Sequence, residues 1–274
     1  MTNRKGFLQR LLAAPYLVWA AIFIVVPMGM VMYYAFTDAA GNFTLQNFQS
    51  ITAFSHTFML SIWMGALATA ICLLISYPLA YIISRMKPRH QKFMMMLVML
   101  PMWINLLLRT YALMKILEDT GLINSILGWF GFEPLHMINT RGAVIAGMVY
   151  NFIPYMIMPI YNVMSRIETP VLEASQDLGG NRWQTLKRVI FPLSVPGIVS
   201  GITMVFVPSV STFYISGKLG GNITLVGDLI EYTFNGEANY NVGATMSLIL
   251  MAMILLCMVI MNQFTQGDEE GILV

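Results

Sequence analysis

The chain has 274 residues, of which 57% are hydrophobic and only 10% are charged, and its mean hydropathy is +0.69. A soluble domain carries about 25% charged residues, so these values exclude an ordinary water-soluble enzyme, a disordered protein and a coiled coil. The formal net charge of +2 gives no global basic field and no sign of nucleic-acid binding. We therefore expect an integral membrane protein whose surroundings are membrane lipid, and we expect no nucleic acid among its partners.

Six apolar stretches are long enough to cross a bilayer core about 30 Å thick. Backbone groups in lipid must be satisfied within their own segment, so each stretch is predicted to be a helix and the fold to be all-α. Five stretches contain no charged residue, whereas the third contains Arg109 and Lys115. The loops leave little room for a soluble domain, which predicts one transmembrane domain over residues 1–274. The predicted helices span residues 13–36, 57–84, 93–117, 142–165, 193–217 and 242–264.

The basic residues predict the orientation of these helices. If the N terminus is cytoplasmic, eleven of the fifteen lysines and arginines lie in inner segments, as the positive-inside rule requires. Both termini are then expected in the cytoplasm. The first apolar stretch exceeds the 7 to 15 residues of a signal-peptide core, so it is expected to remain as a membrane anchor. The eleven inner residues are Arg4, Lys5, Arg10, Arg85, Lys87, Arg89, Lys92, Arg166, Arg182, Lys187 and Arg188.

The predicted inner loop between the fourth and fifth helices, residues 166–192, contains clear helix signals. Thr169 followed by Pro170 predicts the start of a short helix, because a proline at the first helical position loses no hydrogen bond. Gly179 can adopt the left-handed conformation that ends such a helix.

A second short helix is predicted directly afterwards. Asn181 and Gln184 have the spacing of a capping box, and Pro192 is expected to end the helix. We interpret its apolar face as a docking surface in preference to packing within the chain, because the chain has no sizeable soluble domain of its own. This face consists of Trp183, Leu186 and Ile190.

The same loop resembles the EAA loop of bacterial ABC importer permeases. Its Glu173-Ala174-Ser175, Gly179 and Val189-Ile190-Phe191-Pro192 fit the family spacing of Glu-Ala-Ala, three residues, Gly, nine residues and Ile-x-Leu-Pro. The differences are a serine for the second alanine, a valine for the first isoleucine and a phenylalanine for the leucine. The resemblance implies a type I (MetI-like) permease core with six transmembrane helices, multi-pass in the bacterial cytoplasmic membrane.

In that family the EAA loop forms a coupling helix that sits in a groove of the ATP-binding subunit. The resemblance thus implies that this loop binds a partner ATPase. The partner-binding residues it implies are Glu173, Ala174, Ser175, Asp177, Gly179, Arg182, Trp183 and Leu186.

Three further segments resemble one branch of the family, the spermidine/putrescine permeases of the PotB type. They are Asn105-Leu-Leu-Leu-Arg109-Thr-Tyr111, residues 150–161 with two prolines, and residues 206–216 followed by Gly220-Gly221. The branch implies that this chain is part of a polyamine importer and that it has four kinds of partner. These are a second homologous permease (PotC type), two ATP-binding subunits (PotA type), an external polyamine-binding protein (PotD type) and membrane lipid.

Catalytic motifs are absent from the sequence. It has no GxxxxGK[ST] phosphate loop, no HExxH and no GxSxG, so we expect no catalytic residue, no metal site and no cofactor bound by this chain. ATP and Mg are then used by the partner ATPase.

Three alternatives differ from a polyamine permease. An ion-coupled secondary transporter would place ionisable residues in its spans, and none of the thirteen acidic residues lies there. A purely structural subunit is disfavoured by seven prolines that we expect to break the helices, namely Pro27, Pro78, Pro101, Pro154, Pro159, Pro196 and Pro208. A type I permease for iron, sulfate or an amino-acid derivative remains open.

A polyamine path can do without carboxylates. Aromatic faces and carbonyl groups attract ammonium groups with about 0.5–2 kcal/mol per contact, which suits transit better than tight capture. Polar and aromatic positions near the expected helix breaks are therefore the candidates. They are Trp103, Asn105, Tyr150, Asn151, Tyr155, Ser209, Ser211, Phe213 and Tyr214.

Overall fold

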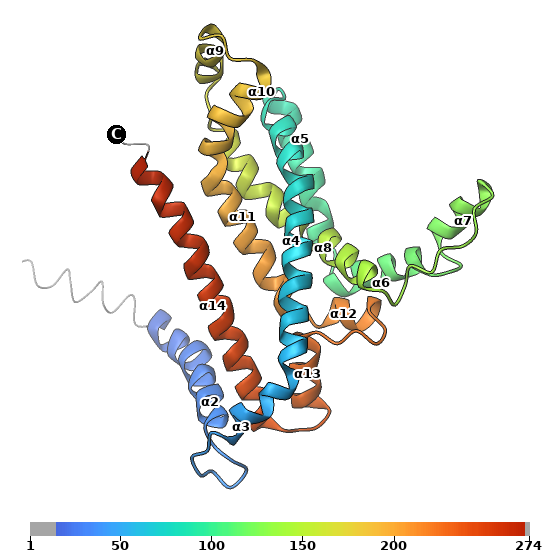
Figure 1. Cartoon of the computed structure of the whole chain (residues 1–274), viewed down its shortest axis with the longest axis vertical. Helices are drawn as coiled ribbons and strands as arrows, with labels where there is room; N and C mark the ends of the chain where they lie inside the picture. The colour runs from blue at the N-terminus through green and yellow to red at the C-terminus, as the bar shows by residue number, and fades with distance from the viewer. Residues whose placement is uncertain (1–14, 272–274) are drawn as a thin grey trace, which may run out of the picture. The chain divides into compact units, whose positions relative to one another are not determined.

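A computed structural model describes residues 15–271 of the chain, with side chains to residue 261, and every regular element in that part is a helix (Figure 1). The predicted all-α fold is therefore confirmed. Within the described residues, five helices are long and apolar enough to cross a membrane, and a sixth candidate span is a pair of helices bent by 93°. The chain divides into two compact units, Met1–Ser55 with Ile230–Ala252, and His56–Leu229 with Met253–Val274.

The first unit contains the first candidate span, Pro15–Ala35. Two asparagine side chains satisfy the carbonyl groups at the end of this span. Asn241 Nδ2 donates to the Thr37 carbonyl at 2.7 Å, and Asn47 Nδ2 donates to the Ala35 carbonyl at 3.2 Å. The elements of this unit are the π-turn η1 (Ala21–Val25), α2 (Val26–Ala35), α3 (Gln46–Ser50), the 3-10 turn η2 (Ile51–Phe54) and the start of α14 (Tyr240–Gly271).

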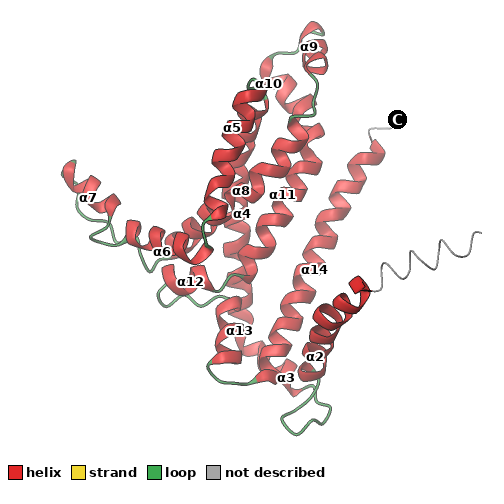
Figure 2. Ribbon diagram, turned by 180° about the vertical axis from the view of Figure 1, so that it is seen from behind, coloured by secondary structure: helices red, strands yellow, loops and turns green. Residues whose placement is uncertain are grey.

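The second unit carries most of the helices. In both views α4, α5, α8 and α11 run beside one another, with α9 and α10 at one end and α6, α7 and α12 toward the other (Figures 1 and 2). Its elements are α4 (Ser55–Ser84), α5 (Pro88–Met99), η3 (Leu100–Trp103), α6 (Leu106–Leu117), α7 (Leu122–Trp129), α8 (Arg141–Met164), α9 (Thr169–Asp177), α10 (Arg182–Thr185), η4 (Leu186–Ile190), α11 (Phe191–Ser211), α12 (Tyr214–Leu219) and the start of α13 (Val226–Asn235).

Helices α8 and α11 form the centre of the second unit. Gly197 and Gly201, four residues apart on α11, let the two backbones approach closely, as small residues do in membrane helix pairs. A Cβ atom on Gly197 would lie 2.8 Å from the Pro159 carbonyl oxygen, and one on Gly201 would lie 2.7 Å from the Met156 sulfur. The surrounding core includes the fully buried Met148, Met156, Ile157, Ile160, Met164, Ile190 and Val205.

The third and fifth predicted helices differ from the structure in ways that change the arrangement of the chain. The third is not continuous: the chain is extended at Ile104 after the η3 turn, and Asn105 caps a new helix, α6, by accepting from Leu107 N at 2.8 Å. The fifth begins at Arg182 and ends at Ser211, so the predictions of a start at residue 193 and an end at residue 217 are wrong. Hydropathy alone did not reveal the breaks at Ile104 and Thr212, because the apolar sequence continues through both of them.

The prediction that Pro192 ends the second short helix is also wrong. The helix continues through a π-turn, η4, whose wider turn gives the proline ring room against the preceding turn. The π-turn η1 stands in the same place before Pro27. In both turns an amide donates to a carbonyl five residues earlier, Val26 to Ala21 and Phe191 to Leu186.

Most of the prolines lie inside continuous helices, contrary to the prediction that they break them. Of the seven prolines predicted to break helices, Pro101 alone lies next to an interruption of its predicted helix. Prolines are tolerated in membrane helices because neighbouring groups and local adjustments satisfy the freed carbonyls. The prolines within helices are Pro78 in α4, Pro154 and Pro159 in α8, and Pro196 and Pro208 in α11.

Candidate coupling loop and transport path

Arg85 fixes the point where the chain leaves α8 and enters the loop of residues 166–192. Its guanidinium donates from Nη1 to the Ile167 carbonyl at 3.1 Å and from Nη2 to the Met164 carbonyl at 3.2 Å. These carbonyls lie at the end of α8, where a cation is favourable and backbone acceptors lack helical partners. In the sequence, Arg85 is one of eleven basic residues predicted to lie inside. No sequence pattern indicates its contact with Ile167 and Met164, which lie about eighty positions away.

The first short helix of the loop is α9. Glu168, and not Thr169, is its N-cap residue, and no side chain caps it, so the predicted threonine cap is wrong. Its end is as predicted: Gly179 has φ of +81°, in the left-handed region. The amide of Gly180 then donates to the Ser175 carbonyl at 3.0 Å, which closes the last turn.

The second short helix begins with the predicted capping box. Gln184 N donates to Asn181 Oδ1 at 2.8 Å, and Asn181 N donates to Gln184 Oε1 at 2.9 Å. A contact that the sequence did not indicate joins the two helices, because the Ser175 and Thr185 hydroxyls lie 3.0 Å apart. The residue that differs from the Glu-Ala-Ala pattern thus holds α9 against α10.

Most of the implied partner-binding residues are on the surface of the isolated chain. Trp183 is 70% exposed, whereas Leu186 is half-buried and Ile190 is fully buried against the core of the second unit. The interpretation of all three as one free docking face is therefore wrong, since two of them anchor the loop to the helix bundle. The exposed residues of the set are Glu173, Ala174, Asp177, Gly179, Arg182 and Trp183.

Trp183 also borders an apolar groove of about 600 Å³ beside the loop. One wall of the groove is α4 and the other is the helix that starts at α10. The residues that line it are Leu73, Leu74, Tyr77, Pro78, Trp183, Leu186, Lys187, Phe191 and Ile198.

The candidate path residues do not form one cluster. Trp103 borders a methionine-rich groove between α5 and α8, and Tyr150 borders a separate apolar groove beside α4. Tyr155 and Phe213 are partly exposed, and Asn105 serves as a helix cap.

Asn151 lies inside the second unit, where it packs against an arginine. Asn151 Nδ2 donates to the Gly147 carbonyl at 2.9 Å. The main-chain carbonyl of Asn151 accepts from Arg109 Nη1 at 3.5 Å. Arg109 is only 6% exposed. The hydroxyls of Ser209 and Ser211 donate to carbonyls of their own helix at 2.7 and 3.0 Å. In this conformation Asn151 and Ser209 are therefore packed inside the bundle.

Tyr214 belongs to a cluster that attracts a cation. The Lys218 ammonium lies 5.4 Å from the Tyr111 ring centre and 6.0 Å from the Tyr214 ring centre. The two rings meet edge to face with centres 6.2 Å apart. Tyr111 comes from α6 and the other two residues from α12. Of these three residues only Tyr214 is a predicted path residue, although the spacing of Tyr214 and Lys218 on one helix indicates their contact.

Known proteins with similar sequences are membrane components of transport systems. Residues 74–266 match the family described as "Binding-protein-dependent transport system inner membrane component". The spermidine/putrescine transport system permease protein PotB of Haemophilus influenzae is 34% identical over 263 residues, covering 90% of this chain and 91% of that protein. PotB of Escherichia coli is 32% identical over 243 residues, covering 85% and 88%.

The fold is also that of a solved transporter. A chain of a bacterial ABC transporter involved in the import of the acidic polysaccharide alginate superposes with a TM-score of 0.78 over 96% of both chains, at 18% identity. The chain therefore belongs to the family of binding-protein-dependent transport system inner membrane components, whose members are multi-pass, non-catalytic permease subunits of ABC transporters without a cofactor of their own.

Proposed function

We propose that this chain is one of two permease subunits of an ATP-driven importer that carries spermidine and putrescine across the cytoplasmic membrane. Its partners are a second permease of the PotC type, two ATP-binding subunits of the PotA type, which use ATP and Mg, and an external polyamine-binding protein of the PotD type. The relatives named as spermidine/putrescine permeases cover about nine-tenths of the chain and support this substrate class.

The observation that carries the proposal is the Tyr111, Tyr214 and Lys218 cluster. Two aromatic rings from different helices contact the Lys218 ammonium, and a polyamine presents the same chemical group, which would take the place of Lys218 at the rings during transit. Such contacts are worth about 0.5–2 kcal/mol each, strong enough to select a cation and weak enough to release it. The other path candidates remain part of the proposal as residues that become accessible when the helices move.

Coupling runs along one helix in this proposal. The exposed residues of α9 and α10 bind the ATPase, and α10 continues through η4 into α11 as a single span, Arg182–Ser211. At 1.5 Å per residue this helix is about 45 Å long. It ends three residues before Tyr214, so a displacement of the loop changes the position of the aromatic cluster. The close packing of α11 on α8 makes the two helices move together.

The orientation of the chain in the membrane is a second part of the proposal. Both termini and the coupling loop of residues 166–192 lie in the cytoplasm, and the whole chain acts as one permease domain. The support is the charge distribution, with eleven of fifteen basic residues in the inner segments.

The test is ATP hydrolysis by the purified transporter in lipid vesicles, with its external binding protein added. Spermidine and putrescine should stimulate hydrolysis, while sulfate, ferric iron and amino-acid derivatives should not. Stimulation by one of those other solutes, without a polyamine effect, would contradict the polyamine assignment and leave the permease family unaffected.

A further inference from the structure

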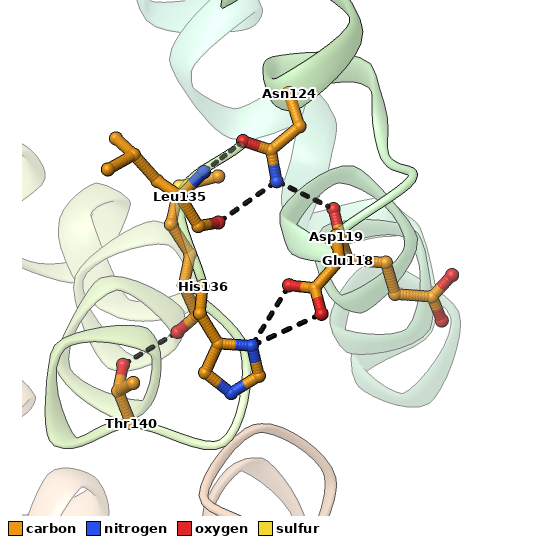
Figure 3. Close-up of polar contacts among 7 residues, drawn as sticks. Glu118, Asp119, Asn124, Leu135, His136 and Thr140 are labelled. Carbon is orange, nitrogen blue, oxygen red and sulfur yellow. Dashed lines mark hydrogen bonds and ion pairs between the residues drawn. The ribbon is translucent and has the colours of Figure 1, made fainter. Parts of the chain in front are cut away.

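The segment between α6 and α8 is held together by hydrogen bonds from its own polar side chains. Asn124 on α7 is buried, and its Nδ2 donates to the Glu118 and Leu135 carbonyls at 3.2 and 3.0 Å, while its Oδ1 accepts from Leu135 N at 2.8 Å (Figure 3). The Ser125 hydroxyl donates to the Gly121 carbonyl at 3.0 Å. Both polar side chains of α7 are thus satisfied by backbone groups of the same segment.

A second contact holds the segment together. His136 Nδ1 lies 3.0 Å from an oxygen of Asp119, which joins the chain before α7 to the chain before α8 (Figure 3). Together with the Asn124 bonds, this contact holds α7 against the irregular segment that leads back to α8, and this packing determines which face of α7 is exposed.

The outward surface of α7 is mainly apolar, and Ser125 is its one polar side chain. Leu122, Ile126 and Trp129 follow one another at intervals of four and three residues, share one helix face, and are all exposed, Trp129 to 90%. The exposed Phe130 and Phe132 continue this surface beyond the helix. A surface helix in water shows the reverse arrangement, with its polar residues outward.

The direction of the segment indicates what covers this surface. The helix pair Leu106–Trp129, which contains α6 and α7, is bent by 93° from Pro88–Trp103. Since α5 runs beside the candidate spans α4, α8 and α11, the α6–α7 pair runs across the spans, close to the plane of the membrane (Figure 1).

We propose that α7 lies in the membrane interface, with Leu122, Ile126 and Trp129 inserted at the boundary between lipid headgroups and acyl chains. Aromatic and aliphatic side chains concentrate at this depth, and helices that lie in the interface bury one apolar face there. On the proposed topology the leaflet is the outer one. The proposal goes beyond the transport function, and it gives α6, which carries Tyr111, a fixed depth in the membrane.

The test uses spin labels in the complete transporter, reconstituted in phosphatidylcholine vesicles with no other reactive cysteine. Labels at Ile126→Cys and Trp129→Cys should collide several-fold more often with oxygen, which concentrates in lipid, than with a water-soluble nickel chelate. Asn42→Cys, at an exposed position in the loop after the first candidate span, is the aqueous control. Leu256→Cys, within the candidate span Tyr240–Met261, is the control for hydrocarbon.

Two results would overturn the proposal. Labels on α7 that meet the nickel chelate as readily as the label at position 42 would show that the surface faces water. Labels protected from both reagents in the complete transporter, but open to oxygen in the chain without its second permease, would show that protein covers the surface instead of lipid.

Discussion

Tyr214 meets the Lys218 ammonium with its ring, so the contributions of ring and hydroxyl can be separated. Tyr214→Ala should weaken the apparent affinity for spermidine about 2- to 30-fold, the equivalent of about 0.5–2 kcal/mol, while Tyr214→Phe should keep most of it. Concentration-dependent uptake in vesicles measures both. Equal loss in the two variants would show that the hydroxyl provides the attraction, and no change in either would remove Tyr214 from the path.

Arg85 is expected to matter more for the coupling loop than its neighbours in the sequence. Arg85→Ala removes two hydrogen bonds from a charged donor to the end of α8, which should cost about 1.5–3 kcal/mol of stability and lower the ATP-dependent uptake. Arg89→Ala, which removes an exposed arginine of the same inner segment, is the matched control. Thermal unfolding in detergent and the ratio of uptake to ATP hydrolysis are the measurements. Equal effects of the two substitutions would contradict a capping role.

At the scale of the helices, the two glycines of α11 differ in what they face. A methyl group on Gly197 meets the Pro159 carbonyl, which is backbone, whereas one on Gly201 first meets the end of the flexible Met156 side chain. Gly197→Ala should therefore destabilise the α8–α11 pair by about 1–3 kcal/mol, and Gly201→Ala by less. Thermal unfolding of the two variants checks the order, and a larger loss for Gly201→Ala would contradict this account.

The turn after α9 allows a similar comparison. Gly179 has φ of +81° and nothing within 4 Å of an added Cβ atom, so a substitution there changes backbone strain and not packing. Gly179→Val should lower the stimulated ATP hydrolysis, while Gly179→Asn should retain most of it because asparagine tolerates the left-handed region. If both variants were fully active, the end of α9 would have no part in coupling.

The sequence predicts contacts between residues that are close together along the chain, and it does not predict contacts between distant segments. The Asn181–Gln184 capping box and the left-handed Gly179 involve near neighbours, and both were predicted correctly. The Arg85 cap and the Ser175–Thr185 contact depend on how segments meet in space. The break at Ile104 could not be predicted for another reason, because the chain there stays apolar although the helix is interrupted.

The candidate path shows the same limit at the level of single side chains. Choosing polar and aromatic residues by type selected Tyr214, which lies in a cation-attracting cluster, and also Asn151 and Ser209, which are packed inside the bundle. Residue type could not distinguish the two groups, because a helix in lipid buries polar side chains against its neighbours and exposes apolar ones. The face of each helix had to be known first.

For the whole molecule, the testable quantity is the orientation in the membrane. The predicted outer loops and the predicted outer end of the third helix contain only four basic residues, against eleven in the segments predicted to lie inside. Translocating the inner segments would carry most of the positive charge across the membrane, which the positive-inside rule disfavours. The coupling loop can meet an ATPase only on the cytoplasmic side, so the charge distribution and the proposed function require the same orientation.

Single cysteines report this orientation directly. In a variant with Cys72 and Cys257 replaced by serine, Trp183→Cys should react with a membrane-impermeant maleimide only in inside-out vesicles. Asn42→Cys and Asn235→Cys, both at exposed positions, should react only from the outside of intact cells. Detergent-solubilised protein, in which every site should react, controls for local protection. Reaction of position 183 from the outside would invert the topology and would leave the exposed residues of α9 and α10 without access to ATP-binding subunits.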